Sequence, residues 1–444
     1  MSSLKENITW TKTEIFLFRL SFVFFIVLSI PFNKLVFHHI GTKVWSFQSF
    51  YQLATFQTSF IPENPVAGIN LSGYYNWLIA LIIALIATLI WQKLSPSKKA
   101  YPQLYYWLRV FLRYRLALAI IATGIVKLFP IQLPLPTLSD LHTAYGDFLP
   151  WKVYFLSTSV SSAYYVVSLG LLEIAAGLLL IYHRTVAIGA GLATALLLNI
   201  VLVNFAYGIG NQVYSSFLLL IALFILSYDL RRIFNLFFLE VQSLADNFVP
   251  NYHPLIKKYR KYLQLTFLLI LFVFGLATYF SWTSTKYPYP ENKGLANTEG
   301  IYDVSKFVLN NDTIPYSLTS PNRWQNVVFE KWNTISIRDN KPVKIDSLRP
   351  EITYQASKER NFEELGNGGR HFYSYQTAAD SNQIILENKT DVTDGYTFAL
   401  TRQGDQEITL KGFNKTGDSL SVVLTRVAKT YLLKEGRRKP IKIY

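Results

Sequence analysis

Four basic residues lie in an otherwise apolar stretch of the sequence, LRVFLRYRLALAIIATGIVKLFP, which runs from residue 108 to residue 130. They are Arg109, Arg113, Arg115 and Lys127. A charged side chain inside hydrocarbon is costly unless it reaches the headgroups or has a partner. Arg109 and Arg113 lie near the start of the stretch and can extend toward the headgroups. Arg115 lies roughly 13 Å deep at 1.5 Å per residue, so it needs a partner.

The next long apolar segment, SLGLLEIAAGLLLIYHR, contains one candidate partner, Glu173. The two segments run in opposite directions, and the depth of Glu173 matches that of Arg115. We therefore expect an intramembrane ion pair between Arg115 and Glu173, shared with Arg113 and with Arg19 of the first apolar segment. Two interpretations of this intramembrane polar cluster stay open. It is either a fixed pair that orders the helices or a working site for a quinone headgroup, a proton or an anion.

A second group of polar residues lies toward the outer ends of the same segments. Lys127 is followed by the loop sequence LFPIQLPLPTLSDL, and several amides flank the turn at 208–210. The functional interpretation is an outward-facing pocket for a polar ligand. Its candidate residues are Lys127, Gln132, Asp140, His142, Asp147, Asn199, Asn204, Asn211 and Gln212. The alternative is an interfacial lysine, a solvated loop, and amides that hydrogen-bond neighbouring helices.

Metal and thiol chemistry have little support in the sequence. The chain contains no cysteine, which excludes disulfides, thiolate catalysis and cysteine metal sites. His38 and His39 lie in another outer loop, but they lack the helical spacing of metal-binding histidines, so no metal site is predicted. There is no haem ligand pair at membrane depth and no Gly-rich nucleotide loop.

Composition identifies the elements that must position these residues as membrane helices. The chain has 444 residues, of which 51% are hydrophobic and only 16% are charged, where soluble domains have about a quarter charged. A membrane span needs roughly 20 mostly apolar residues. The qualifying segments lie at about 14–33, 74–92, 106–129, 160–182, 185–206, 213–228 and 262–283. The first has no cleavage site of a signal peptide, so we expect it to be retained.

The distribution of charge predicts how these spans are oriented. Residues 1–289 contain 21 Lys and Arg against 9 Asp and Glu, and residues 290–444 contain 22 against 19. The excess basic charge therefore lies in the hydrophobic part, which suits lipid headgroups and argues against nucleic-acid binding. Most of the Lys and Arg residues in the segments that connect the spans lie on the side of the membrane that contains the N-terminus. We therefore expect that side to be cytoplasmic. Seven spans then place everything after Trp282 in the periplasm of a bacterium.

The predicted cytoplasmic connection from Asp229 to Lys261 contains a helical pattern of its own. RRIFNLFFLEVQSLADNF repeats apolar residues at helical spacing, and its one-sided apolar positions are Ile233, Phe234, Phe237, Phe238, Val241, Leu244 and Phe248. We interpret this as an interfacial helix with Arg231 and Arg232 at headgroup level. The alternative is a simple extension of the sixth span.

The pattern of apolar and polar residues changes near residue 290. YPYPENKGLANTEG predicts a linker at 286–299, and short alternating segments such as QEITLKGF and SLSVVLTRVA follow it, separated by turn residues. Residues 300–444 therefore form an antiparallel β domain, and EGIYDVSKF resembles the opening strand of lipocalin-like barrels. We expect a barrel or sandwich that folds alone from about Leu295. Its expected interior residues are Val328, Trp332, Phe398, Leu400, Ile408, Leu410, Val422 and Leu424.

Within the helical domain, residues 1–285, the core at about 106–230 resembles the DoxX family of membrane proteins. The matching features are the Arg-bearing helix RYRLALAIIATGIVKLFP with its G-x-x-K end, the Glu-containing SLGLLEIAAGLLLIYHR, a basic turn, and the Gly- and Ala-rich helix TVAIGAGLATALLLNIVLVNF. The resemblance implies a small helical membrane unit. Some relatives are counted as subunits of a membrane thiosulfate:quinone oxidoreductase, and others are linked to redox stress.

Three classes of function remain at this point. The first is a DoxX-like membrane scaffold or subunit whose periplasmic β domain binds a ligand or a protein partner. The second is a quinone-interacting, non-catalytic subunit of a membrane redox complex, and the third is a small-solute transporter. The chain lacks convincing inverted repeats with broken helices, which argues against transport. We do not expect a complete enzyme or a resident cofactor, and a quinone is the ligand that the second class requires.

Overall fold

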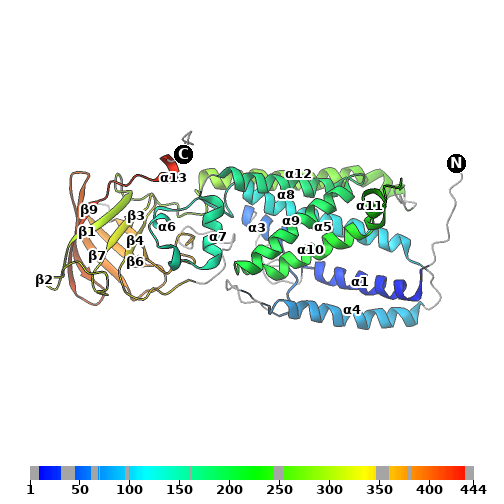
Figure 1. Cartoon of the computed structure of the whole chain (residues 1–444), viewed down its shortest axis with the longest axis horizontal. Coiled ribbons are helices and arrows are strands. Elements are labelled where there is room, and N and C mark those ends of the chain that lie inside the picture. The colour runs from blue at the N-terminus through cyan, green and yellow to red at the C-terminus, as the bar shows by residue number, and fades with distance from the viewer. Residues whose placement is uncertain are drawn as a thin grey trace. The chain divides into compact units, whose positions relative to one another are not determined.

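The computed structural model describes residues 10–31, 46–61, 69, 71–95, 100–160, 163–243, 250, 254–346, 360–377 and 382–435. The chain divides into two compact units (Figure 1). The first comprises Met1–Phe129 and Val167–Tyr279, and the second comprises Pro130–Val166 and Phe280–Tyr444. Residues 130–159 were expected to connect two spans of the helical domain. They instead fall in the unit that contains the β domain, where Ser139 hydrogen-bonds Glu330 and Ser336.

The first unit is a bundle of helices. Its elements are α1 (Lys12–Ser29), α3 (Phe47–Ala54), α4 (Tyr74–Leu94), α5 (Pro102–Leu128), α8 (Ala163–Ile181), α9 (Val186–Ala206), α10 (Gln212–Ser227), α11 (Leu230–Phe237) and α12 (Pro254–Ser284). Each of the seven apolar segments expected to span a membrane coincides with one of these helices. The sequence therefore predicts the positions of the long helices correctly.

Among the described residues, four helices are long and apolar enough to cross a membrane: α4, α8, α9 and α12. The number becomes five if α10 and α11, which meet at a bend of 66°, form one broken span. α1 and α5 differ from these four because every 18-residue stretch of either helix contains at least three charged side chains, for example Lys12, Glu14 and Arg19 in α1. The structure thus supports a multi-pass helical part, with fewer spans by length and composition than the seven expected.

Glycines bring α5 and α8 unusually close together. A Cβ added at Gly170 would lie 2.6 Å from the carbonyl oxygen of Gly124, and one added at Gly124 would lie 2.7 Å from that of Gly170. A Cβ at Gly177 would collide with the side chain of Ile121. Small residues at these positions let two helix backbones touch, which is the usual way that membrane helices gain packing energy.

The second unit contains an antiparallel β-barrel. Its strands are β1 (Gly300–Leu309), β2 (Asp312–Thr313), β3 (Asn326–Phe329), β4 (Thr334–Arg338), β5 (His371–Thr377), β6 (Gln383–Asn388), β7 (Gly395–Gln403), β8 (Glu407–Asn414) and β9 (Ser419–Arg426). Neighbours follow the chain order, and β1 also pairs with β9. Eight strands therefore close into a barrel with β2 added beside β1, and closure removes the unpaired edges of the sheet.

The barrel interior is apolar, as period-two alternation predicts. Six of the eight expected interior residues belong to the core cluster: Phe398, Leu400, Ile408, Leu410, Val422 and Leu424. The other two expectations are wrong. Val328 is buried but alternates with the inward-facing Val327, so it lies on the outer face of β3. Trp332 follows β3 in a loop, where its ring stacks on Tyr289 with centroids 4.4 Å apart.

The outer face of β3 and β4 is covered by a layer of short helices, which we call the covering layer. This layer contains α6 (Leu138–Leu141), the 3-10 helix Tyr145–Asp147 and α7 (Pro150–Ser159). All four residues from Thr334 to Ile337 are buried, so β4 has no solvent-facing side. The segment expected as a linker, 286–299, also packs on the barrel, since Gly294 donates from its backbone to Lys331 and Tyr287 is buried.

Candidate functional site

Arg113 binds the end of a neighbouring helix. Its Nε donates to the carbonyl oxygen of Leu180 at 2.9 Å, and its Nη2 donates to that of Ile181 at 3.0 Å. Leu180 and Ile181 are the last residues of α8, where carbonyl groups have no partner within the helix. A guanidinium at this position supplies the missing donors and a charge that complements the negative end of the helix dipole.

Arg115 and Arg19 make contacts of the same kind. Arg115 donates to the carbonyl oxygens of Ala54 at 3.0 Å and Phe56 at 2.6 Å, at and just beyond the end of α3. Arg19 donates to the carbonyl oxygen of Ser95, the residue that follows α4. Three buried arginines in the bundle therefore each satisfy the C-terminal carbonyls of a different helix, which accounts for cations in apolar segments without a ligand.

Glu173 pairs with Lys127 and not with Arg115. The Nζ of Lys127 lies 2.6 Å from Oε1 of Glu173, and the two side chains are 12% and 5% exposed. The expected pairing of Arg115 with Glu173 is therefore wrong. It assumed that the start of α5 and the end of the antiparallel α8 lie at the same level, whereas Arg113, well inside α5, already lies beside the last turn of α8. The residues of α5 that precede Arg113 extend beyond that end.

The Lys127–Glu173 pair lies within the glycine contact between α5 and α8. Gly170 packs against the Cβ of Lys127, so the two charges are held between closely spaced backbones. The second carboxylate oxygen of Glu173, Oε2, is buried and accepts no hydrogen bond among the described residues. An oxygen of this kind can accept a proton or a hydrogen bond from a ligand.

The residues expected to form one outer pocket join separate networks. In the bundle, the amide of Asn204 donates to the hydroxyl of Ser215 at 2.8 Å, and Gln212 donates to the backbone oxygen of Asn204 at 3.1 Å. Asn204 also donates to the backbone oxygen of Asn211 at 3.3 Å. These amides fix the turn between α9 and α10, as the structural alternative states, whereas Asn199 is exposed on α9.

The remaining pocket candidates belong to the β-barrel unit. Asp140 closes the first turn of α6 through the backbone nitrogen of Thr137 at 3.0 Å, and its Oδ1 lies 3.5 Å from Nζ of Lys152. The ring of His142 is hydrogen-bonded to the hydroxyl of Tyr431 at 2.7 Å. Gln132 has a buried side-chain oxygen. His38 and His39 lie outside the described residues. Among the residues that the structure describes, no group of three acidic or histidine side chains is placed to hold a metal ion.

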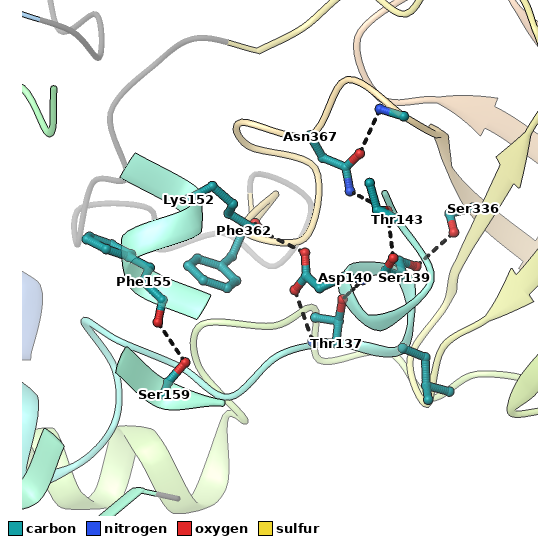
Figure 2. Close-up of polar contacts among 12 residues, drawn as sticks. Thr137, Ser139, Asp140, Thr143, Lys152, Phe155, Ser159, Ser336, Phe362 and Asn367 are labelled. Atoms are coloured by element: carbon teal, nitrogen blue, oxygen red, sulfur yellow. Dashed lines mark hydrogen bonds and ion pairs between the residues drawn. The ribbon is translucent and has the colours of Figure 1, made fainter. Parts of the chain in front are cut away.

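A buried chain of polar groups, not expected from the sequence, ties residues 137–143 to the barrel (Figure 2). The carboxylate of Glu330 accepts from the backbone nitrogen of Ser139 at 2.7 Å and from its hydroxyl at 2.6 Å. That hydroxyl lies 2.8 Å from the hydroxyl of Ser336, to which Arg370 donates at 2.7 Å. Arg370 is completely buried and also donates to the backbone oxygen of His142.

A second buried ionic group lies beside this chain. The ammonium group of Lys152 is fully buried, donates to the backbone oxygen of Phe362 at 2.6 Å and lies over its ring. Lys389 and Thr334 both donate to Oε1 of Glu363, at 2.6 Å and 3.0 Å. Acids and bases are thus paired beneath the covering layer, which offsets the cost of removing their charges from water.

Burial shifts the proton affinities of this network. It raises the pKa of Glu330 to about 7, even though the two hydrogen bonds from Ser139 favour the charged form. It also raises the pKa of Glu364 to about 7. Burial and the nearby Arg370 and Lys429 lower the pKa of His142 to about 4, so this ring is neutral at physiological pH. The one sequence signal for these residues is a charge directly beside apolar runs, as in VVFEKW and PWKVYF.

An open groove of about 460 Å³ lies on the barrel at β1, β8 and β9. It is lined by Val308, Asn311, Lys411, Gly412, Phe413, Ser419, Leu420 and Ser421. Phe413 is 59% exposed. Its ring lies beside a lysine and two serine hydroxyls, and an exposed aromatic ring is the feature of this surface that protein interfaces enrich.

Comparison with known proteins adds one partial similarity. No family model and no solved structure matches the chain. It is 37% identical over 73 residues to the uncharacterized protein YwoB of Bacillus subtilis (strain 168). The match covers 16% of this chain and 47% of that protein, so the chain spans about half the length of the curated relative it matches.

Proposed function

We propose that this chain is a DoxX-like protein of the bacterial inner membrane that acts as a scaffold or subunit and presents a β-barrel for binding a ligand or partner. The barrel lies in the periplasm and the N-terminus in the cytoplasm. The observation that carries the proposal is the packing of residues 130–166 on the barrel. Because these residues connect α5 to α8 and α12 leads into β1, three passages of the chain join the bundle to the barrel unit.

The contacts that the buried polar residues of the bundle make support a scaffold role. Three arginines are occupied with helix ends, and the amides near α10 fix a turn. The groove around Phe413 is then the part of the barrel surface that we assign to a partner. These features match a role in assembly better than catalysis by this chain alone.

Co-purification from membranes tests this proposal. The full chain is extracted in mild detergent, and bound chains are identified by mass spectrometry for the wild type, for Phe413→Ser and for Val392→Ser. Val392 is 83% exposed on the barrel and does not line the groove, so it is the matched control. We expect a stoichiometric partner with the wild type and the control, and its loss with Phe413→Ser. A chain that purifies alone in all three preparations contradicts the proposal.

Reporter fusions test the orientation separately. Alkaline phosphatase is active only in the periplasm, so a fusion after Tyr444 should be active and a fusion within 229–261 should be inactive. The opposite pattern would overturn the assignment of the barrel to the periplasm and the positive-inside argument on which it depends.

A second function has one observation in its favour. Oε2 of Glu173 has no partner among the described residues and belongs to the same carboxylate that Lys127 contacts. A quinone carbonyl could accept from the ammonium group, and a quinol hydroxyl could donate to Oε2, as a quinone-interacting subunit of a redox complex requires. Solvent extraction of the purified protein tests this alternative. Quinone that is retained by the wild type and lost with Glu173→Gln supports it, and wild type without quinone rejects it.

A further inference from the structure

The short helix α11 leaves its preceding helix at a sharp angle. Only Tyr228 and Asp229 separate it from α10, and the two helix axes differ by 66° (Figure 1). A straight extension of α10, one of the two interpretations of this segment, is therefore wrong. The chain turns at the end of an apolar helix and begins a new helix in a different direction.

One side of α11 is apolar and exposed. Leu230, Phe234 and Phe237 are 57%, 49% and 78% exposed, and Phe238, which follows the helix, is 73% exposed. Spacings of three and four residues place these side chains on one face. The rings of Phe234 and Phe238 stack with centroids 5.1 Å apart, which makes that face continuous.

Basic side chains occupy the other side of the same helix. Arg231 is exposed, and Arg232 lies 3.9 Å from the carboxylate of Asp229 with its side chain 39% exposed. Asn235 completes this polar side. The chain then returns to α12, whose first turns contain Lys257, Lys258 and Lys261. α11 and the first turns of α12 are thus basic as well as aromatic, and Asp229 and Glu240 flank α11.

We propose that α11 lies in the plane of the membrane surface and binds anionic phospholipids. Its phenylalanines enter the boundary of the acyl chains, and Arg231 and Arg232 contact lipid phosphates. Chain continuity selects the bilayer as the occupant of the apolar face. α11 begins three residues after the end of α10 and is only about 12 Å long at 1.5 Å per residue, so it stays near the level at which α10 ends. The inference requires a membrane around the bundle but not the binding role of the barrel.

Spin labelling tests this inference directly, because the chain has no native cysteine. Single variants Phe237→Cys and Asn235→Cys receive a nitroxide and are reconstituted in lipid nanodiscs. One set of discs contains phosphatidylcholine alone, and the other also contains phosphatidylglycerol. Accessibility to oxygen reports the acyl region, and accessibility to a water-soluble nickel chelate reports the aqueous phase. Leu202→Cys on α9, where the native side chain is 61% exposed, reports whether the bundle lies in the bilayer.

We expect the label at 237 to favour oxygen over nickel and the label at 235 to show the reverse. Adding phosphatidylglycerol should deepen the label at 237, and Arg231→Gln with Arg232→Gln should remove that response, with about a fivefold loss of lipid preference for each arginine. Equal nickel accessibility at 237 and 235 overturns the inference if the label at 202 is protected. Nickel accessibility at 202 overturns the membrane placement itself. Dipolar coupling between labels at 237 on two molecules assigns the face to a second copy and also overturns the inference.

Discussion

The ammonium nitrogen of Lys127 lies 2.6 Å from Oε1 of Glu173, so the acid of α8 is neutralised by the last cation of α5. The pair lies where the backbones of Gly124 and Gly170 touch. Close backbones and a short ion pair reinforce each other, because the small residues leave room for the lysine to reach across while the pair opposes separation of the helices. The contact between α5 and α8 therefore has both a shape and a charge requirement.

Breaking the pair on one side should be more damaging than removing both charges. Lys127→Met or Glu173→Leu leaves an unpartnered buried charge, and each should reduce the free energy of unfolding by about 3 kcal/mol. The double variant should recover much of this loss. Thermal unfolding of the three variants in detergent, followed by size-exclusion chromatography, measures the coupling. Additive losses would show that the two side chains act independently.

The glycine contact predicts a strong dependence on position. Gly170→Ala places a methyl group 2.6 Å from a backbone oxygen that cannot move away alone, so the helices must separate at a cost of about 1–3 kcal/mol. Gly191→Ala on α9 is the matched control, since its added Cβ meets nothing within 4 Å. The control should be neutral or slightly stabilising, because alanine favours helix. Equal unfolding temperatures for the two variants would contradict this packing.

Arg115→Met should leave the carbonyl oxygens of Ala54 and Phe56 without their donor. We expect a loss of about 1–3 kcal/mol, the typical cost of an unsatisfied buried polar group. The effect should be independent of Glu173. A double variant with Glu173→Leu should therefore lose the sum of the two single losses within about 0.5 kcal/mol. A large deviation from that sum, measured by the same thermal unfolding, would restore a direct pairing of Arg115 with Glu173.

Apolar length and alternation were sufficient to predict the long helices and the antiparallel β domain, but not the short helices α3, α6 and α7. The long helices coincide with the apolar segments, and inward positions such as Phe398 and Leu410 follow the alternation of β7 and β8. Val328 shows where alternation fails. Because β3 is covered on both faces, its run VVF contains no polar position to mark the outside.

The partners within the polar clusters were not predictable in the same way. Counting residues from a helix end gives a depth but assumes that neighbouring helices end together, and α5 with 27 residues is longer than α8 with 19. Glu330 shows a different difficulty. It meets Ser139 across 191 positions of the sequence, and no local pattern relates them.

The buried carboxyl group of Glu330 predicts a dependence of stability on pH. Its pKa is about 7 in the folded protein, above its ordinary value of 4.5. Between these values the folded state holds a proton that the unfolded state has lost, so the contribution of Glu330 to stability is greatest below pH 4.5. It falls as the pH rises through 7, by on the order of 3 kcal/mol in total.

Glu330→Gln isolates this contribution. The amide oxygen can still accept from Ser139 but does not titrate. The unfolding temperature of the wild type, measured relative to that of the variant, should therefore fall from pH 5 to pH 8. Comparing differences cancels the opposite effect of His142, whose lowered pKa makes stability rise with pH below about 6.5. A constant difference over this range would mean that Glu330 keeps one charge state throughout, despite the nearby Asp140, Glu363 and Arg370.

The covering layer predicts which fragment of the chain folds best. A fragment that starts at Leu295 keeps all the strands but exposes Val328 and leaves Glu330 and Arg370 without Ser139 and His142. A fragment in which residues 130–160 are joined by a flexible linker to residues 284–435 restores these contacts and the stacking of Tyr289 on Trp332.

We expect both fragments to show the circular dichroism of a β protein. The longer fragment should unfold at a temperature at least about 2–4 °C higher, as a gain of 1 kcal/mol or more in a domain of this size implies. Replacing Ser139 by Ala in the longer fragment should remove part of that gain. Equal stability of the two fragments would mean that the barrel folds without the covering layer, and that residues 130–160 pack on it without stabilising it.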